Sequence, residues 1–204
     1  MATHADIMET IPAAPRPAAR EALEMLASRR SPAPDTLVAP APGAEEIETM
    51  LRIATRVPDH GRIAPWRLIL IAGEAKANWL AKLMEIAESR DDAPKARVSA
   101  RKLASAPLVV VLVSSPTPGH KIPEWEQQLS AGAVGMNLLH AAHALGYGAN
   151  WLTGWHAYDP AATALLGLGE QEKVAAVMPM GTVAQPTAER ERPDTDRIAT
   201  WLEL

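Results

Sequence analysis

The chain has 204 residues, of which 48% are hydrophobic, and a formal net charge of −4. This length and apolar content indicate one folded domain with a substantial core, and the lack of a basic face argues against a nucleic-acid partner. The chain contains no cysteine, which excludes disulfides, thiolate nucleophiles and thiolate metal sites.

The N-terminal residues mix alanine, proline and polar side chains without a period. We expect a flexible tail over residues 1–20 and a single domain over residues 21–204. No apolar run reaches membrane-spanning length, and no signal-peptide core is visible, so we expect a cytoplasmic protein without a membrane partner.

Apolar spacing predicts a helix over residues 20–28, a proline-rich connector over 34–42 and a second helix over 43–54. Further helices are expected after Gly73, with Trp79, Leu83 and Ala87 on one face, over 124–145 and over 160–166. Residues 90–95 are expected to be polar and mobile. Strands are expected over 68–71, 108–113, 149–153 and 174–180. The strand at 108–113 is apolar on both faces and should be central.

No glycine-rich phosphate loop follows any of these strands. A nucleotide-like ligand would therefore have to be held by side chains. Arg29-Arg30-Ser31 offers two guanidinium groups and a hydroxyl that suit a phosphate. The alternative is that this basic pair only complements the dipole of the preceding helix.

Residues 55–66 form a second candidate segment, between a predicted helix and a predicted strand. Pro58 and Pro65 prevent a helix from crossing it, and the segment carries Arg56 and His60. Such stiff loops often hold binding residues. The alternatives are that its charges face water and that His60 only bonds the loop backbone, with Asp59 anchoring the turn.

The long helix predicted over residues 124–145 carries other titratable side chains. His140 and His143 share one face, but a zinc site would need a further ligand, so we expect packing histidines and no metal. Glu124 and Glu126 are two residues apart and do not face each other, so a capping or solvated role is expected for them.

Several motifs in order identify a known family. The chain resembles the flavin-dependent nitroreductases, in particular their small, single-domain branch, over residues 23–202. Besides Arg29-Arg30-Ser31, the resemblance rests on Arg56-Val57-Pro58-Asp59-His60, Ala64-Pro65-Trp66, Lys121-Ile122-Pro123-Glu124-Trp125-Glu126-Gln127, Ser130-Ala131-Gly132, Ala144-Leu145-Gly146-Tyr147-Gly148 and Trp151-x-x-Gly154.

The resemblance implies an α+β fold with a central mixed β-sheet flanked by helices, built as an intertwined homodimer with FMN at the subunit interface. The C-terminal extension would dock on the partner subunit. By position, FMN would be bound by Arg29, Arg30 and Ser31 of one chain and by Arg56 and His60 of its partner. Leu152, Thr153 and Gly154 would lie along the flavin ring. A pyridine nucleotide is assigned to Ala142, His143, Ala144, Leu145, Gly146 and Tyr147.

The activity implied by the resemblance is hydride transfer from NAD(P)H through FMN to nitroaromatic or quinone-like acceptors, in a ping-pong mechanism. Because the flavin N5 does the chemistry, no catalytic side chain is expected. One alternative is a flavin-binding protein for storage, sensing or assembly, without turnover. Another is a specialised dehydrogenase or dehalogenase on the same fold.

Overall fold

The computed structural model describes residues 17–202, which divide into two compact units. One unit is Arg29–Thr187, and the described residues before and after it belong to the other. This second unit contains helix α2 (Arg20–Ser28) and the 3-10 turn η4 (Thr195–Arg197). Most of the tail predicted at residues 1–20 lies outside the described residues.

The larger unit is built on a five-stranded sheet with β1 (Leu37–Val38), β2 (Trp66–Ala72), β3 (Leu108–Ser114), β4 (Gly148–Ala149) and β5 (Lys173–Val183). The strand order is β1-β5-β3-β2, and β4 also pairs with β5. Every strand pair within residues 17–202 is antiparallel, where we expected a mixed sheet. Between β2 and β3 the chain forms two helices that pack against each other. The end of β2 at Ala72 pairs with the start of β3 at Leu108.

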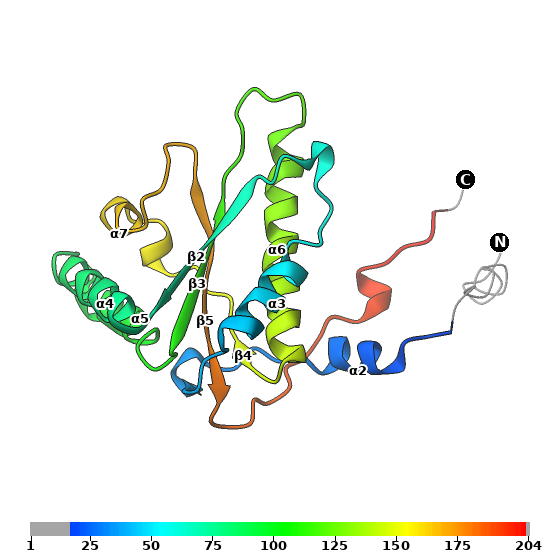
Figure 1. Cartoon of the computed structure of the whole chain (residues 1–204), viewed down its shortest axis with the longest axis horizontal. Coiled ribbons are helices and arrows are strands. Elements are labelled where there is room, and N and C mark those ends of the chain that lie inside the picture. Colours follow the sequence, from blue (N-terminus) through cyan, green and yellow to red (C-terminus); the bar gives the residue numbers. More distant parts are fainter. Residues whose placement is uncertain (1–16, 203–204) are drawn as a thin grey trace. The chain divides into compact units, whose positions relative to one another are not determined.

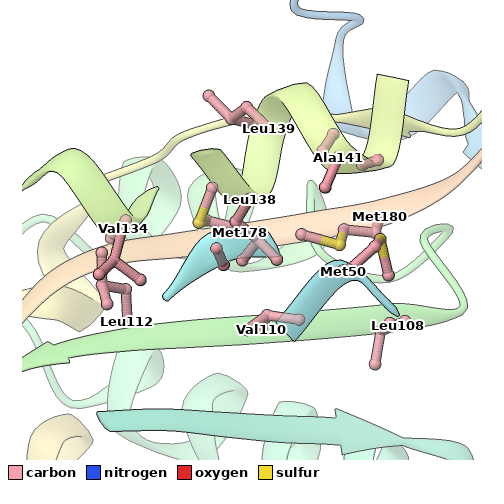
Figure 2. Close-up of a cluster of buried hydrophobic side chains, with 14 residues drawn as sticks. Met50, Leu108, Val110, Leu112, Val134, Leu138, Leu139, Ala141, Met178 and Met180 are labelled. Atoms are coloured by element: carbon pink, nitrogen blue, oxygen red, sulfur yellow. The ribbon is translucent and has the colours of Figure 1, made fainter. Parts of the chain in front are cut away.

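Strand β3 explains why the sheet lies between two helical layers. Its alternate side chains enter different cores, because successive residues of a strand point to opposite faces. Leu108, Val110 and Leu112 pack with α3 (Ala44–Ala54) and α6 (Glu124–Ala144), as Figure 2 shows. Val109 and Val111 pack with α4 (Gly73–Glu88), α5 (Ala93–Arg101) and α7 (Pro160–Ala164) on the other face (Figure 1). The α+β class, with a central sheet flanked by helices, is confirmed.

Helix α6 buries one face against the sheet and leaves apolar side chains on another. Val134 and Leu138 lie in the core, whereas Trp125 is 68% and Leu129 is 54% exposed. Gly135 is required by close packing, because a Cβ there would lie 2.3 Å from a ring atom of Trp151. Helix α6 is therefore buried along one face and uncovered along the other.

Two elements differ from the sequence-based prediction. Residues 90–95 were expected to be mobile, but helix α5 begins at Ala93 and buries Ala96 and Ala100. The strand predicted at 149–153 is limited to β4 and an isolated bridge between Leu152 and Val177. Between them Asn150 donates its backbone N–H to the carbonyl of Pro179 at 3.2 Å, and proline has no N–H to return the bond.

Short 3-10 turns complete the unit: η1 (Pro34–Thr36), η2 (His60–Arg62) and η3 (Trp155–Ala157). Within residues 17–202, no helix has the length and apolar character that crossing a membrane would require.

Candidate functional site

The Arg29-Arg30-Ser31 segment is fixed at the β4 edge of the sheet. The side-chain amide of Asn150 donates to the carbonyl oxygen of Pro32 at 2.7 Å. The backbone at Gly148 lies close to the Pro32 ring, because a Cβ on residue 148 would be only 2.9 Å from it. Within the segment, Arg29 Nη1 donates to Ser31 Oγ at 3.1 Å. Arg30 Nη1 donates to the carbonyl oxygen of Arg29 at 3.1 Å, so both guanidiniums bond within this short stretch.

The C-terminal end of α6 adds two imidazoles, those of His140 and His143, to the region around Arg29. Burial is the main cause that lowers the pKa of both histidines, and the positive charge of Arg29 lowers both further. His140 Nδ1 is buried and has no hydrogen-bond partner within residues 17–202. The two guanidiniums supply the positive charge and N–H donors that suit a phosphate group. Within residues 17–202, no group of three or more histidine, cysteine, aspartate or glutamate side chains is placed to hold a metal ion.

Residues 152–154 continue along the outer edge of β5. Leu152 exchanges two backbone hydrogen bonds with Val177, at 3.0 and 2.9 Å. A Cβ on Gly154 would lie 2.8 Å from both His156 Nε2 and Ser99 Oγ, so a larger residue there would displace one of these side chains. His156 is 2% exposed, and burial lowers its pKa to about 4, which keeps the ring neutral near pH 7. The segment predicted to border the flavin ring is therefore seated on a buried, uncharged support.

The loop carrying Arg56 and His60 is held by its own carboxylate and by α6. Asp59 accepts hydrogen bonds from the backbone N–H groups of Ile63 and Ala64, at 3.1 and 3.0 Å, and so anchors the turn. Two side chains of α6 bond the loop backbone. Ser130 Oγ donates to the Pro58 carbonyl at 2.7 Å, and Asn137 Nδ2 donates to the Arg56 carbonyl at 3.0 Å.

His60 contacts a side chain that the sequence reading assigned to solvent or capping. Its Nδ1 lies 2.8 Å from Glu126 Oε2, although the two residues are 66 positions apart. Next to this pair is a cavity of about 340 Å³ lined by Pro58, His60, Glu126, Leu129, Ser130 and Ala133. Residues 126, 130 and 137 fall on one side of α6, but only the fold shows that this side faces the loop carrying His60.

The predicted cofactor residues fall into two groups at different edges of the sheet. Arg29, Arg30 and Ser31 share the β4–β5 edge with residues 152–154, whereas Arg56 and His60 precede β2 at the other edge. In Figure 1 the η2 turn lies beside the first turn of α6, and β4 lies beside the other end of that helix. One chain does not bring the two groups together.

The segment predicted for a pyridine nucleotide is partly core. Ala142 is fully buried in the cluster between the sheet and α6, so burial excludes it from contact with a ligand and corrects its assignment. Gly146 terminates the helix with φ +86°, and Tyr147 donates its hydroxyl to Glu46 at 2.8 Å. These contacts explain the Gly146-Tyr147 pair as helix termination and packing.

A larger cavity of about 580 Å³ lies beside α7 and the start of β5, with Tyr158, Glu172 and Lys173 among its lining residues. None of the predicted site residues lines it. Its volume alone is no reason to place the cofactor there instead of beside the two groups of predicted cofactor residues.

Comparison with known proteins gives a consistent result. The model of the nitroreductase family matches residues 27–182. The chain is 37% identical over 165 residues to the protein named "Putative NAD(P)H nitroreductase YdjA" of Escherichia coli (strain K12), covering 79% of this chain and 88% of that one. It is 36% identical over 187 residues to a Haemophilus influenzae protein named "Putative NAD(P)H nitroreductase", covering 89% of this chain and 100% of that one.

Solved structures agree in fold. A nitroreductase-like family protein from Bacillus cereus superposes with a TM-score of 0.79 at 19% identity, covering 94% of this chain and 100% of that one. A nitroreductase with bound FMN from Bacteroides fragilis superposes with a TM-score of 0.69 at 21% identity, covering 90% and 99%. The fold, the family model and the two relatives lead to one conclusion: this chain belongs to the nitroreductase family.

Proposed function

We propose that this protein is an FMN-dependent oxidoreductase that uses NAD(P)H to reduce nitroaromatic or quinone-like acceptors. The observation that carries the proposal is the segment of residues 29–31, which presents two guanidiniums and a hydroxyl at the sheet edge where residues 152–154 also lie. The names of the two relatives, each called "Putative NAD(P)H nitroreductase", and the FMN bound to the Bacteroides fragilis structure support it.

The residues at the β4–β5 edge fit FMN by their donor chemistry. Arg29, Arg30 and Ser31 would hold the anionic, oxygen-rich part of the cofactor through charge-assisted hydrogen bonds. Leu152, Thr153 and Gly154 would border the ring, where the absence of a Cβ at Gly154 keeps the backbone close to His156 and Ser99. When bound, FMN would supply the ring that accepts hydride and passes electrons on.

A second copy of the chain would complete the site. Arg56 and His60 lie at the other sheet edge from Arg29, so their use for the same FMN requires a partner. Helix α6 offers an uncovered apolar face, with Trp125 and Leu129, of the kind that a subunit interface buries. We therefore propose a homodimer with FMN at its interface, and a C-terminal extension that docks on the partner through Ile198, Trp201 and Leu202.

The purified chain tests the proposal directly. After incubation with FMN and removal of free flavin, we expect bound flavin absorbance and a particle of dimer size by light scattering. Anaerobic mixing with NADH or NADPH in a stopped-flow instrument should bleach that absorbance. A protein that retains no FMN would refute the proposal. A protein that retains FMN but is not bleached would instead be a flavin carrier without turnover.

The order of the reaction has its own test. One open face used in turn by NAD(P)H and the acceptor gives ping-pong kinetics. Initial rates with a nitroaromatic or a quinone should then give parallel double-reciprocal lines at several NAD(P)H concentrations. Intersecting lines would show that both substrates bind together.

A further inference from the structure

The contact between His60 and Glu126 carries an inference that rests on the proposed function. Nδ1 of His60 lies 2.8 Å from Oε2 of Glu126, and both side chains are partly exposed beside the 340 Å³ cavity. An ionised carboxylate has only acceptor oxygens. The proton of a neutral His60 ring therefore resides on Nδ1, and Nε2 is the nitrogen left to meet a ligand.

The backbone around this pair is fixed independently of the pair itself. Ser130, one turn after Glu126 on α6, donates to the Pro58 carbonyl at 2.7 Å and accepts from Trp66 Nε1 at 3.2 Å. On the loop, Gly61 has a φ of +74° and lies against Ile122, just before α6. Because these contacts hold the loop on the helix, loss of Glu126 would free the imidazole ring without releasing the loop.

We propose that Glu126 is a positioning residue, which sets the orientation of the His60 ring and the nitrogen that it presents to the FMN of the partner subunit. A carboxylate that fixes the tautomer of a functional histidine is a common arrangement in proteins. Glu126 acts through His60 and needs no contact with the flavin itself. Its effect on flavin binding must therefore vanish when His60 is absent.

The first measurement reads the tautomer. In full-length protein with ¹⁵N-labelled histidine, long-range ¹H–¹⁵N spectra at pH 8 should show His60 with a protonated Nδ1, its signals being assigned by their loss in His60→Gln. Glu126→Ala should move His60 toward the Nε2–H tautomer. Glu126→Gln, whose amide oxygen still accepts, should keep Nδ1–H. An unchanged tautomer in Glu126→Ala would overturn the proposal.

The second measurement is the FMN dissociation constant, obtained by fluorescence titration of the flavin-free protein. Glu126→Ala should weaken FMN binding about tenfold, as for one charge-assisted hydrogen bond partly screened by water. Glu126→Gln should weaken it less. Glu126→Ala combined with His60→Ala should bind no more weakly than His60→Ala alone. Equal effects of Glu126→Ala with and without His60 would show that Glu126 does not act through the imidazole.

Glu124→Ala is the matched control. It removes one carboxylate from the same turn of α6, where Glu124 accepts from Gln128 Nε2 at 3.0 Å. We expect it to leave both the His60 tautomer and the FMN dissociation constant unchanged. If the wild-type chain binds no FMN, the proposed function and this role of Glu126 both fail. If it binds FMN and Glu126→Ala binds equally well, only the inference about Glu126 fails.

Discussion

The side-chain amide of Asn150 donates a hydrogen bond of 2.7 Å to the carbonyl oxygen of Pro32, joining segments 118 residues apart in the chain. This bond ties the Arg29-Arg30-Ser31 segment to the strand edge that continues into residues 152–154. The two stretches proposed to contact one FMN are therefore mechanically connected. A change at Asn150 should affect flavin binding although the amide itself points at the protein backbone.

Asn150→Ala should raise the FMN dissociation constant roughly fivefold, because the loss of one hydrogen bond costs about 1 kcal/mol and loosens the segment that carries both arginines. Flavin fluorescence titration measures the effect. Asn78→Ala, at an exposed position of α4, is the matched control and should bind FMN like the wild type. Equal affinities of the two variants would contradict a role for the Asn150–Pro32 bond in positioning residues 29–31.

His156 should make the stability of the protein depend on pH in a defined window. Burial lowers its pKa from 6.5 to about 4, so between these values the unfolded chain binds a proton that the folded chain does not. The free energy of unfolding should thus be highest above pH 6.5 and fall by roughly 2–3 kcal/mol as the pH approaches 4. Urea unfolding at several pH values measures this slope. His156→Gln should flatten it, and a variant with the full wild-type slope would show that another group is responsible.

The pair formed by Arg67 and Glu172 acts in a lower pH window. Arg67 Nε and Nη2 donate to the two Glu172 oxygens at 2.7 and 2.6 Å, and this hydrogen bonding is the main cause that lowers the pKa of Glu172 to about 2. The stabilisation is present above the ordinary carboxyl pKa of 4.5 and is lost as the pH falls through about 2.

Glu172→Gln should reduce the free energy of unfolding at pH 7 by about 1–2 kcal/mol, a figure lowered for the partial exposure of Arg67. The difference from the wild type should shrink toward pH 2. Glu170→Gln, at an exposed neighbouring position, is the control and should have no measurable effect. If Glu172→Gln is as stable as the control at pH 7, the pair of Arg67 and Glu172 does not contribute to the free energy of unfolding.

Two glycines of α6 should respond in opposite ways to a methyl group. A Cβ on Gly135 would lie 2.3 and 2.6 Å from Trp151 ring atoms. For a Cβ on Gly132, apart from the adjoining residues and backbone of the helix itself, no atom of residues 17–202 lies within 4 Å. Gly135→Ala should cost about 1–3 kcal/mol through overpacking, and Gly132→Ala should gain up to about 1 kcal/mol through helix propensity. Thermal unfolding compares the two variants. Similar melting temperatures would rule out Trp151 as the constraint, and size-exclusion chromatography reports separately on the assembly state.

Much of the fold could be predicted from local pattern alone. The run at residues 108–113 is apolar at every position and rich in valine, which is typical of a strand buried on both faces, as β3 is. Helix α5 was missed because Ala96 and Ala100 form its buried stripe, and a stripe of alanines inside a charged stretch looks like a polar loop. The break after β4 was missed because it depends on Pro179 of another strand.

The candidate site shows a similar division. Arg29, Arg30, Arg56 and His60 could be singled out because their residue types and order match family motifs. Glu126 and Asn150 could not, since each acts on a partner that the fold alone brings near, Glu126 on His60 and Asn150 on Pro32. Ala142 was placed wrongly because a motif match does not report which side of a helix faces the core.

The separation of Arg30 and His60 on different sheet edges has a genetic consequence. In a mixed dimer of one Arg30→Ala chain and one His60→Ala chain, one flavin position would carry both defects and the other would carry none. When the two alleles are co-expressed and pair at random, about half of the dimers should be mixed, each with one intact flavin position. About a quarter of all flavin positions should therefore be restored, which is intragenic complementation.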